Sequence, residues 1–155
     1  MKSTIQLLLF ILLTSTGSAQ VNYNYEPTPH HPYGLPNPDA PKELLDFAPL
    51  IGECQCKSIS RIDQNTWGDT TEMTWRYKYI MNGMAIQDET LKADGKHSGS
   101  IRQFIPDSAR WFVHYYSSSG PTATLPAWEG GKTENGNIIL YKDQTAPNGT
   151  PGNYK

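Results

Sequence analysis

The stretch that decides the fold is TWRYKYIMNGMAIQDETL, residues 74–91. On both sides of its Asn82-Gly83 dipeptide, apolar or aromatic residues alternate with polar ones, which is the period of a half-buried β-strand. Asn-Gly supplies the two positive φ angles that a two-residue type I′ turn requires. The stretch therefore predicts a β-hairpin in which Met81 lies opposite Met84.

This register assigns each side chain of the hairpin to a face. Tyr77 lies opposite Asp88 on a face that also carries Trp75 and Tyr79. That aromatic face must be the buried one, because the other face places Arg76 opposite Glu89, a charge pair suited to solvent. The hairpin therefore carries the carboxyl group of Asp88 into the interior.

The next loop, in KADGKH (residues 92–97), decides which face of the following strand is buried. A two-residue loop at 94–95 places Asp88 opposite Ile101, whereas a three-residue loop at 94–96 places it opposite Arg102. An unpaired buried carboxylate is costly, and a hydrogen-bonded guanidinium largely offsets that cost. We prefer the three-residue loop, which predicts an interior pair between Asp88 and Arg102.

The third hairpin follows from that choice. A four-residue loop at 106–109 pairs Ile105 with Arg110, turns Trp111, Val113 and Tyr115 inward, and turns His114 outward. A single histidine without a paired acid or nucleophile rarely marks a catalytic site. The candidate ligand-binding residues are therefore the interior ones: Trp75, Tyr77, Tyr79, Asp88, Arg102, Trp111 and Tyr115.

The rest of the chain after Gly52 repeats this pattern of strand-length runs separated by turn signals, with no helical crossover. We expect strands at residues 53–62, 70–81, 84–92, 97–105, 111–118, 127–134 and 137–142, and a further one that begins at Asn153. A short helix is expected after Pro41, ending at Pro49. The predicted fold class is all-β: an antiparallel up-and-down barrel with a short N-terminal helix.

The N-terminal region has the sequence patterns of a signal peptide and of a disordered tether. Lys2, an apolar run at 5–13 and small residues at 17–19 are typical of a signal peptide, here residues 1–19, so we expect a secreted or periplasmic protein. No cysteine lies near the cut, so no membrane anchor is expected. Six prolines in residues 20–41 predict a disordered tether, in which His30-His31 is interpreted as solvated. A formal net charge of −2 gives no reason to expect a nucleic-acid partner.

Cys54 and Cys56, the two cysteines of the chain, lie two apart in a predicted strand. On a strand both side chains point to one face with Cα atoms about 6.5–7 Å apart, at the limit of disulfide geometry. The favoured interpretation is a pair of small buried thiols. A strained disulfide and a metal site are the alternatives, although no second ligand cluster accompanies the pair.

Four blocks carry a resemblance to a known family: LIGECQCKS, MNGMAIQD, GSIRQFIPDSARWFVHYYS and WEGGKTENGNIILY. In this order they resemble segments of a bacterial family of lipocalin-like, or calycin-like, β-barrels of unknown function. The resemblance implies an up-and-down barrel with an interior pocket, and it places Asp88, Arg102 and Trp111 in the matching blocks. Because that family continues for further strands, residues 42–155 are expected to form a barrel domain truncated at its C-terminus.

The interior row leads to a function hypothesis. We expect a secreted β-barrel that binds a small amphipathic or anionic molecule in its interior, with no cofactor and no metal. One alternative is an isomerase-like or cyclase-like barrel enzyme with Asp88 as base and Arg102 holding an anion. A non-enzymatic protein is preferred, since the sequence has no G-x-S-x-G, H-E-x-x-H or phosphate-loop motif. The other alternative is a structural or interaction module whose internal salt bridge binds no ligand.

Overall fold

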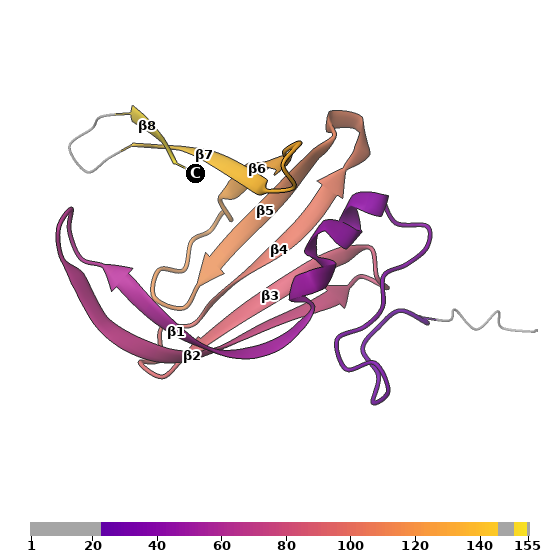
Figure 1. Ribbon diagram of the computed structural model, residues 1–155, viewed down its shortest axis with the longest axis horizontal. Coiled ribbons are helices and arrows are strands. Elements are labelled where there is room, and N and C mark those ends of the chain that lie inside the picture. The colour runs from indigo at the N-terminus through magenta and orange to yellow at the C-terminus, as the bar shows by residue number, and fades with distance from the viewer. Residues whose placement is uncertain (1–22, 146–150, 155) are drawn as a thin grey trace, which may run out of the picture.

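The computed structural model describes residues 23–145 and 151–154. Strands of one antiparallel sheet follow each other in chain order, and the sheet curls into a half-barrel (Figure 1). The predicted all-β, up-and-down class is confirmed. The elements are η1 (Lys42–Leu50), β1 (Gly52–Arg61), β2 (Trp67–Ile80), β3 (Ala85–Lys92), β4 (Ser98–Ile105), η2 (Pro106–Ser108), β5 (Arg110–Ser117), β6 (Ala127–Lys132), β7 (Ile138–Thr145) and β8 (Pro151–Tyr154).

The expected strands are all present, with ends that move by up to three residues. β2 begins at Trp67 and β7 runs to Thr145, so both are longer than predicted. The expected helix after Pro41 is a 3₁₀ helix that includes Pro49 and ends at Leu50. Proline fixes φ at about −65°, which lies within the range of a 3₁₀ helix, so Pro49 fits near its end.

The β2–β3 register is the predicted one, with Tyr77 opposite Asp88 and Arg76 opposite Glu89. The turn is wider than predicted: the ladder ends at Ile80 and Ala85 instead of at the two methionines. Met81, Asn82 and Gly83 all have positive φ angles, of 55°, 52° and 78°. The Asn-Gly dipeptide thus sets the register even though a third residue joins the left-handed turn.

The predicted β3–β4 register is wrong in detail. Asp88 lies opposite Ser100, and Arg102 lies opposite Ile86, one pair further along. This shift moves each partner by two residues, so every side chain keeps its predicted face. The physical reason is reach: the long arginine contacts Asp88 along the diagonal of the ladder, and the small serine fits directly opposite the carboxylate.

The β4–β5 hairpin is confirmed, with Ile105 opposite Arg110 across the 106–109 loop. Trp111 and Val113 are buried on the concave face. Tyr115 lies on the same face but is 44% exposed, because it stands near the open end of its strand. His114 lies on the convex face, as predicted, opposite Ile101.

The core fills one end of the half-barrel under η1 (Figure 1). Leu44 and Phe47 point from η1 onto the concave face, where they pack against a set of buried residues of β2, β3 and β5. The Phe47 and Trp111 rings meet edge to face with centroids 4.7 Å apart. The members from the sheet are Tyr77, Tyr79, Ile86 and Trp111.

The prediction of a disordered tether is wrong for residues 23–41. This segment binds the β2–β3 turn: the Asn37 N–H donates to the Gly83 carbonyl at 3.1 Å, and the Tyr25 N–H donates to Asn82 Oδ1 at 3.1 Å. The Tyr79 N–H donates to the Tyr33 carbonyl at 2.8 Å, which occupies the edge of β2 beyond β1. Prolines exclude regular structure here but leave enough other N–H groups to dock the chain.

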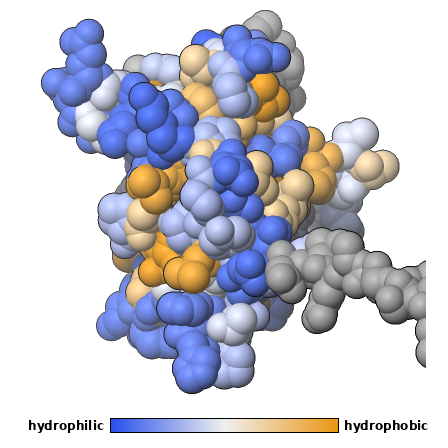
Figure 2. Space-filling view, turned by 90° about the vertical axis from the view of Figure 1, so that its right-hand side faces the viewer, coloured by the Kyte–Doolittle hydropathy of each residue, from blue (hydrophilic) through white to orange (hydrophobic). Residues whose placement is uncertain are grey.

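Residues 1–22 lie outside the described ranges, so the predicted signal peptide stays a prediction. Within residues 23–145 and 151–154, no helix is long and apolar enough to span a bilayer. The face that carries the N-terminal segment shows apolar side chains scattered among hydrophilic ones (Figure 2).

Candidate functional site

A buried carboxylate, Asp88, organises the polar interior of the half-barrel. It is 5% exposed and accepts hydrogen bonds from side chains of the two neighbouring strands, β2 and β4. The Trp75 indole donates to Oδ2 at 2.8 Å, and Oδ1 accepts from the Ser100 hydroxyl and from Arg102 Nη1. The cost of burying the charge is thereby met by three donors, one of them cationic.

Arg102, the ion partner of Asp88, is also fixed by several contacts. Its guanidinium lies between two rings, with Cζ 5.0 Å from the Phe47 centroid and 4.9 Å from the Tyr77 centroid. Nη2 donates to the Tyr77 hydroxyl at 3.3 Å. Its Nε is the one buried side-chain polar atom without a partner in the described part of the chain. Such an orphaned donor is rare in a folded interior.

Tyr77 closes this network on the side of the core. Burial, with a smaller contribution from the Asp88 charge, raises the pKa of the Tyr77 phenol to about 12, although Arg102 acts in the opposite direction. The phenol therefore stays neutral across the physiological range and serves as a hydrogen-bond partner rather than as a base.

The network forms part of the wall of a cavity of about 280 Å³. Of the seven predicted site residues, Trp75, Asp88, Arg102 and Tyr115 line this cavity. The other three, Tyr77, Tyr79 and Trp111, are packed in the core beneath η1. The predicted residues thus share one face of the sheet, but three of them lie at its filled end.

Other cavity residues were absent from the predicted set. Ser100 could have been found by alternation, because it lies two positions before Arg102 on the same strand. Trp128 lies opposite Val113, but the connection at 118–126 is too long to fix that register from sequence. The remaining members are Thr90, Ser98, Gly99, Val113 and Leu140.

A cavity of about 280 Å³ is the volume of about nine liquid waters and is near the lower limit of known ligand pockets. A second cavity, of about 570 Å³, shares Ser98 and Tyr115 with it. Its other lining residues include Glu89, Leu91 and Tyr116, which alternate with the concave-face residues of β3 and β5. This second cavity therefore opens mainly on the convex face, beside the connection at 118–126.

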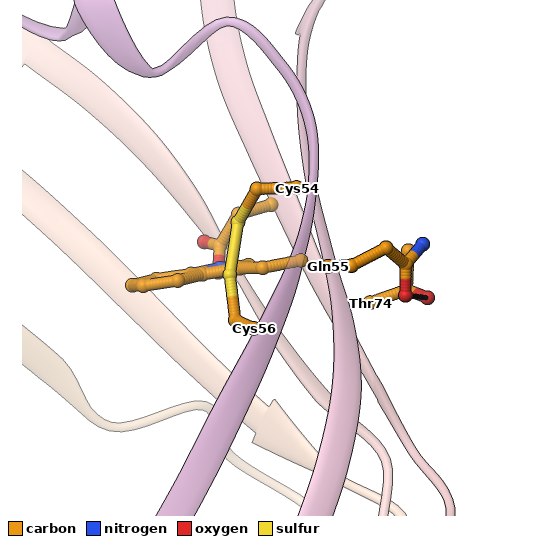
Figure 3. The surroundings of a disulfide bond; sticks show 6 residues. Cys54, Gln55, Cys56 and Thr74 are labelled. Carbon is orange, nitrogen blue, oxygen red and sulfur yellow. Dashed lines mark hydrogen bonds between the residues drawn. A yellow bond between two sulfur atoms is a disulfide. The ribbon is translucent and has the colours of Figure 1, made fainter.

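The cysteine pair lies on β1, on the same face as Trp75, with Cys54 exposed and Cys56 partly exposed. Cys54 and Cys56 form a disulfide with Cα atoms 5.9 Å apart, so the favoured prediction of two free thiols is wrong and the disulfide alternative holds. Gln55 and Thr74 lie on the other side of the sheet, where their side chains share a hydrogen bond of 3.1 Å (Figure 3). Within the described residues, no three His, Cys, Asp or Glu side chains form a metal cluster.

Comparisons with known proteins identify no relative: no family model, no curated protein and no solved structure matches the chain. What defines its class is therefore the architecture itself, an antiparallel all-β half-barrel compatible with a calycin-like fold. Function must be argued from the interior site.

Proposed function

We propose that this chain is an extracytoplasmic, calycin-like protein that binds a small amphipathic molecule inside its half-barrel. The observation that supports this most is that the ion pair between Asp88 and Arg102 lies in the wall of a cavity lined also by aromatic side chains. The guanidinium has N–H groups beyond those bonded to Asp88 and Tyr77, and an anionic ligand oxygen would add attraction to its charge.

The lining of the interior cavity suggests how such a ligand lies. Its polar group points to Arg102, and its apolar body packs against Val113, Trp128 and Leu140. Because Asp88 already neutralises Arg102, we expect a neutral acceptor or a single carboxylate to bind better than a multiply charged anion.

The enzyme alternative is less well supported. A general base needs a free lone pair directed at its substrate. Asp88 instead accepts three hydrogen bonds, so proton abstraction would first require this network to open. The same network gives the protein rigidity, which suits selective binding.

The proposed location outside the cytoplasm rests on two features. The N-terminal sequence has the pattern of a signal peptide. The disulfide between Cys54 and Cys56 belongs to a class of bond that persists mainly in oxidising compartments.

A titration with a dansyl-labelled fatty acid tests the binding proposal, with its methyl ester as the uncharged comparison. We expect saturable binding at one site and a loss of about tenfold in affinity for the acid in Arg102→Lys, which keeps the charge but loses the planar fork. Arg110→Lys is the matched control, because Arg110 is half exposed and pairs with Glu129 away from the cavity. Non-saturable binding, or equal losses in the two variants, would contradict the proposal.

A further inference from the structure

We propose that the Cys54–Cys56 disulfide is a thiol–disulfide exchange site that accepts electrons from dithiols. The two cysteines are separated only by Gln55 on β1, and their disulfide lies on the side of the sheet opposite Gln55 (Figure 3). This site is distinct from the ion pair between Asp88 and Arg102, and it does not depend on the proposed ligand.

The disulfide bond is accessible from outside the sheet. β1 is the first strand in the sheet order and pairs with β2 alone among the described strands. Cys54 is exposed, and Cys56 is partly exposed. Exposed disulfides are the reducible, regulatory or catalytic ones, whereas structural disulfides resist reduction. An external thiolate can therefore approach the sulfur of Cys54.

The disulfide bond adds little to the stability of the fold. A disulfide stabilises a protein more when it closes a longer loop, and here one residue separates the two ends. The same residues are already fixed by the ladder to β2, which pairs every position from Gly52 to Ile59 without a break. A cross-link at this place adds little constraint, so its chemistry is the better explanation of its presence.

The exchange balances as a two-electron transfer. The thiolate of an external dithiol attacks Cys54 Sγ, a mixed disulfide forms, and Cys56 leaves as a thiolate. The second thiolate of the dithiol then attacks the dithiol sulfur of the mixed disulfide, which releases Cys54. The dithiol becomes a disulfide, and its two protons end on Cys54 and Cys56.

The sheet supplies a spectroscopic signal for this step. Trp75 lies directly opposite Cys54, where side chains of neighbouring strands are about 5 Å apart at Cβ. A disulfide quenches a nearby indole, so reduction should raise the emission of Trp75. The increase should disappear in Trp75→Phe, which separates this signal from the emission of the other tryptophans.

The experiment measures the redox state of the full chain by intact-mass spectrometry after maleimide capture. One arm uses glutathione, a monothiol, and the other a synthetic peptide with two cysteines, so the outcome also distinguishes monothiols from dithiols. We expect capture of two maleimides per chain in the dithiol arm at millimolar thiol. A chain that stays oxidised in the dithiol arm would overturn the proposal.

Single serine variants test which sulfur is attacked. Cys56→Ser leaves the exposed Cys54 and should form a mixed disulfide with oxidised glutathione about tenfold faster than Cys54→Ser. Equal rates, or a faster Cys54→Ser, would overturn the order of attack. The double variant should keep the urea midpoint of the oxidised chain. Loss of its fold would instead assign the disulfide a structural role.

Discussion

Truncation of the buried arginine is the perturbation that the structure predicts most sharply. Arg102→Ala removes the positive charge that pairs with Asp88 and the guanidinium group that contacts the rings of Phe47 and Tyr77. Breaking a buried ion pair from one side costs about 3–5 kcal/mol, because the remaining charge has lost its partner. Trp75 still donates to the carboxylate, so we expect the lower half of that range, about 3–4 kcal/mol.

Urea unfolding monitored by tryptophan emission measures this loss as a change in midpoint at constant slope. Asp88→Asn combined with Arg102→Met should recover about half of it, since an amide removes the stranded charge and still accepts a hydrogen bond. Arg110→Ala is the control and should cost about 0–1 kcal/mol, as exposed pairs do. If Arg102→Ala costs no more than Arg110→Ala, the interior pair contributes nothing and our reasoning is wrong.

Three further predictions concern the fold around the site. Gly83 and Gly95 both have φ near 78°, but only Gly83 abuts the backbone of the N-terminal segment. Gly83→Ala should therefore lower the free energy of unfolding more than Gly95→Ala does. Hydrogen exchange in the N-terminal segment should rise in Gly83→Ala alone. Gly130→Ala should cost about 1–3 kcal/mol through contact with a β7 carbonyl, whereas Gly131→Ala, with its nearest atom at 3.9 Å, should be near neutral by urea midpoint. Burial raises the pKa of Tyr77 to about 12. Its contribution to the free energy of unfolding is therefore complete below pH 10 and is lost as the pH rises toward 12. This alkaline loss of about 2–3 kcal/mol should be absent in Tyr77→Phe.

The sequence predicted which face of the sheet each side chain occupies better than it predicted the cross-strand residue pairs. Asn82-Gly83 fixed the register of β2 and β3, and the alternation of side chains then predicted the buried residues of β3, β4 and β5. The predicted pairing of Arg102 with Asp88 requires ion partners to lie directly opposite each other. The side chain reaches diagonally instead, and the loop at 93–97 is longer than its Asp-Gly turn signal indicated.

Two other features could not be predicted for related reasons. Proline content indicates the absence of regular structure, but it does not reveal that Asn37 binds a turn 45 residues away. An ideal strand places the cysteines too far apart for an easy bridge, whereas the actual strand brings their Cα atoms to 5.9 Å. Both errors come from applying local rules where a tertiary contact or a covalent bond decides the geometry.

Native mass spectrometry of the chain purified without denaturation tests the central claim, an occupied interior cavity, most directly. Val113→Phe provides the comparison, because Val113 lines the cavity directly opposite Arg102 on the neighbouring strand, and a larger ring fills space that a ligand needs. We predict that the wild-type chain carries a small molecule that leaves on collisional activation and that the folded Val113→Phe variant carries none. A wild-type chain with no adduct that also fails to bind the dansyl-labelled acid, or an adduct retained in full by the variant, would contradict the account.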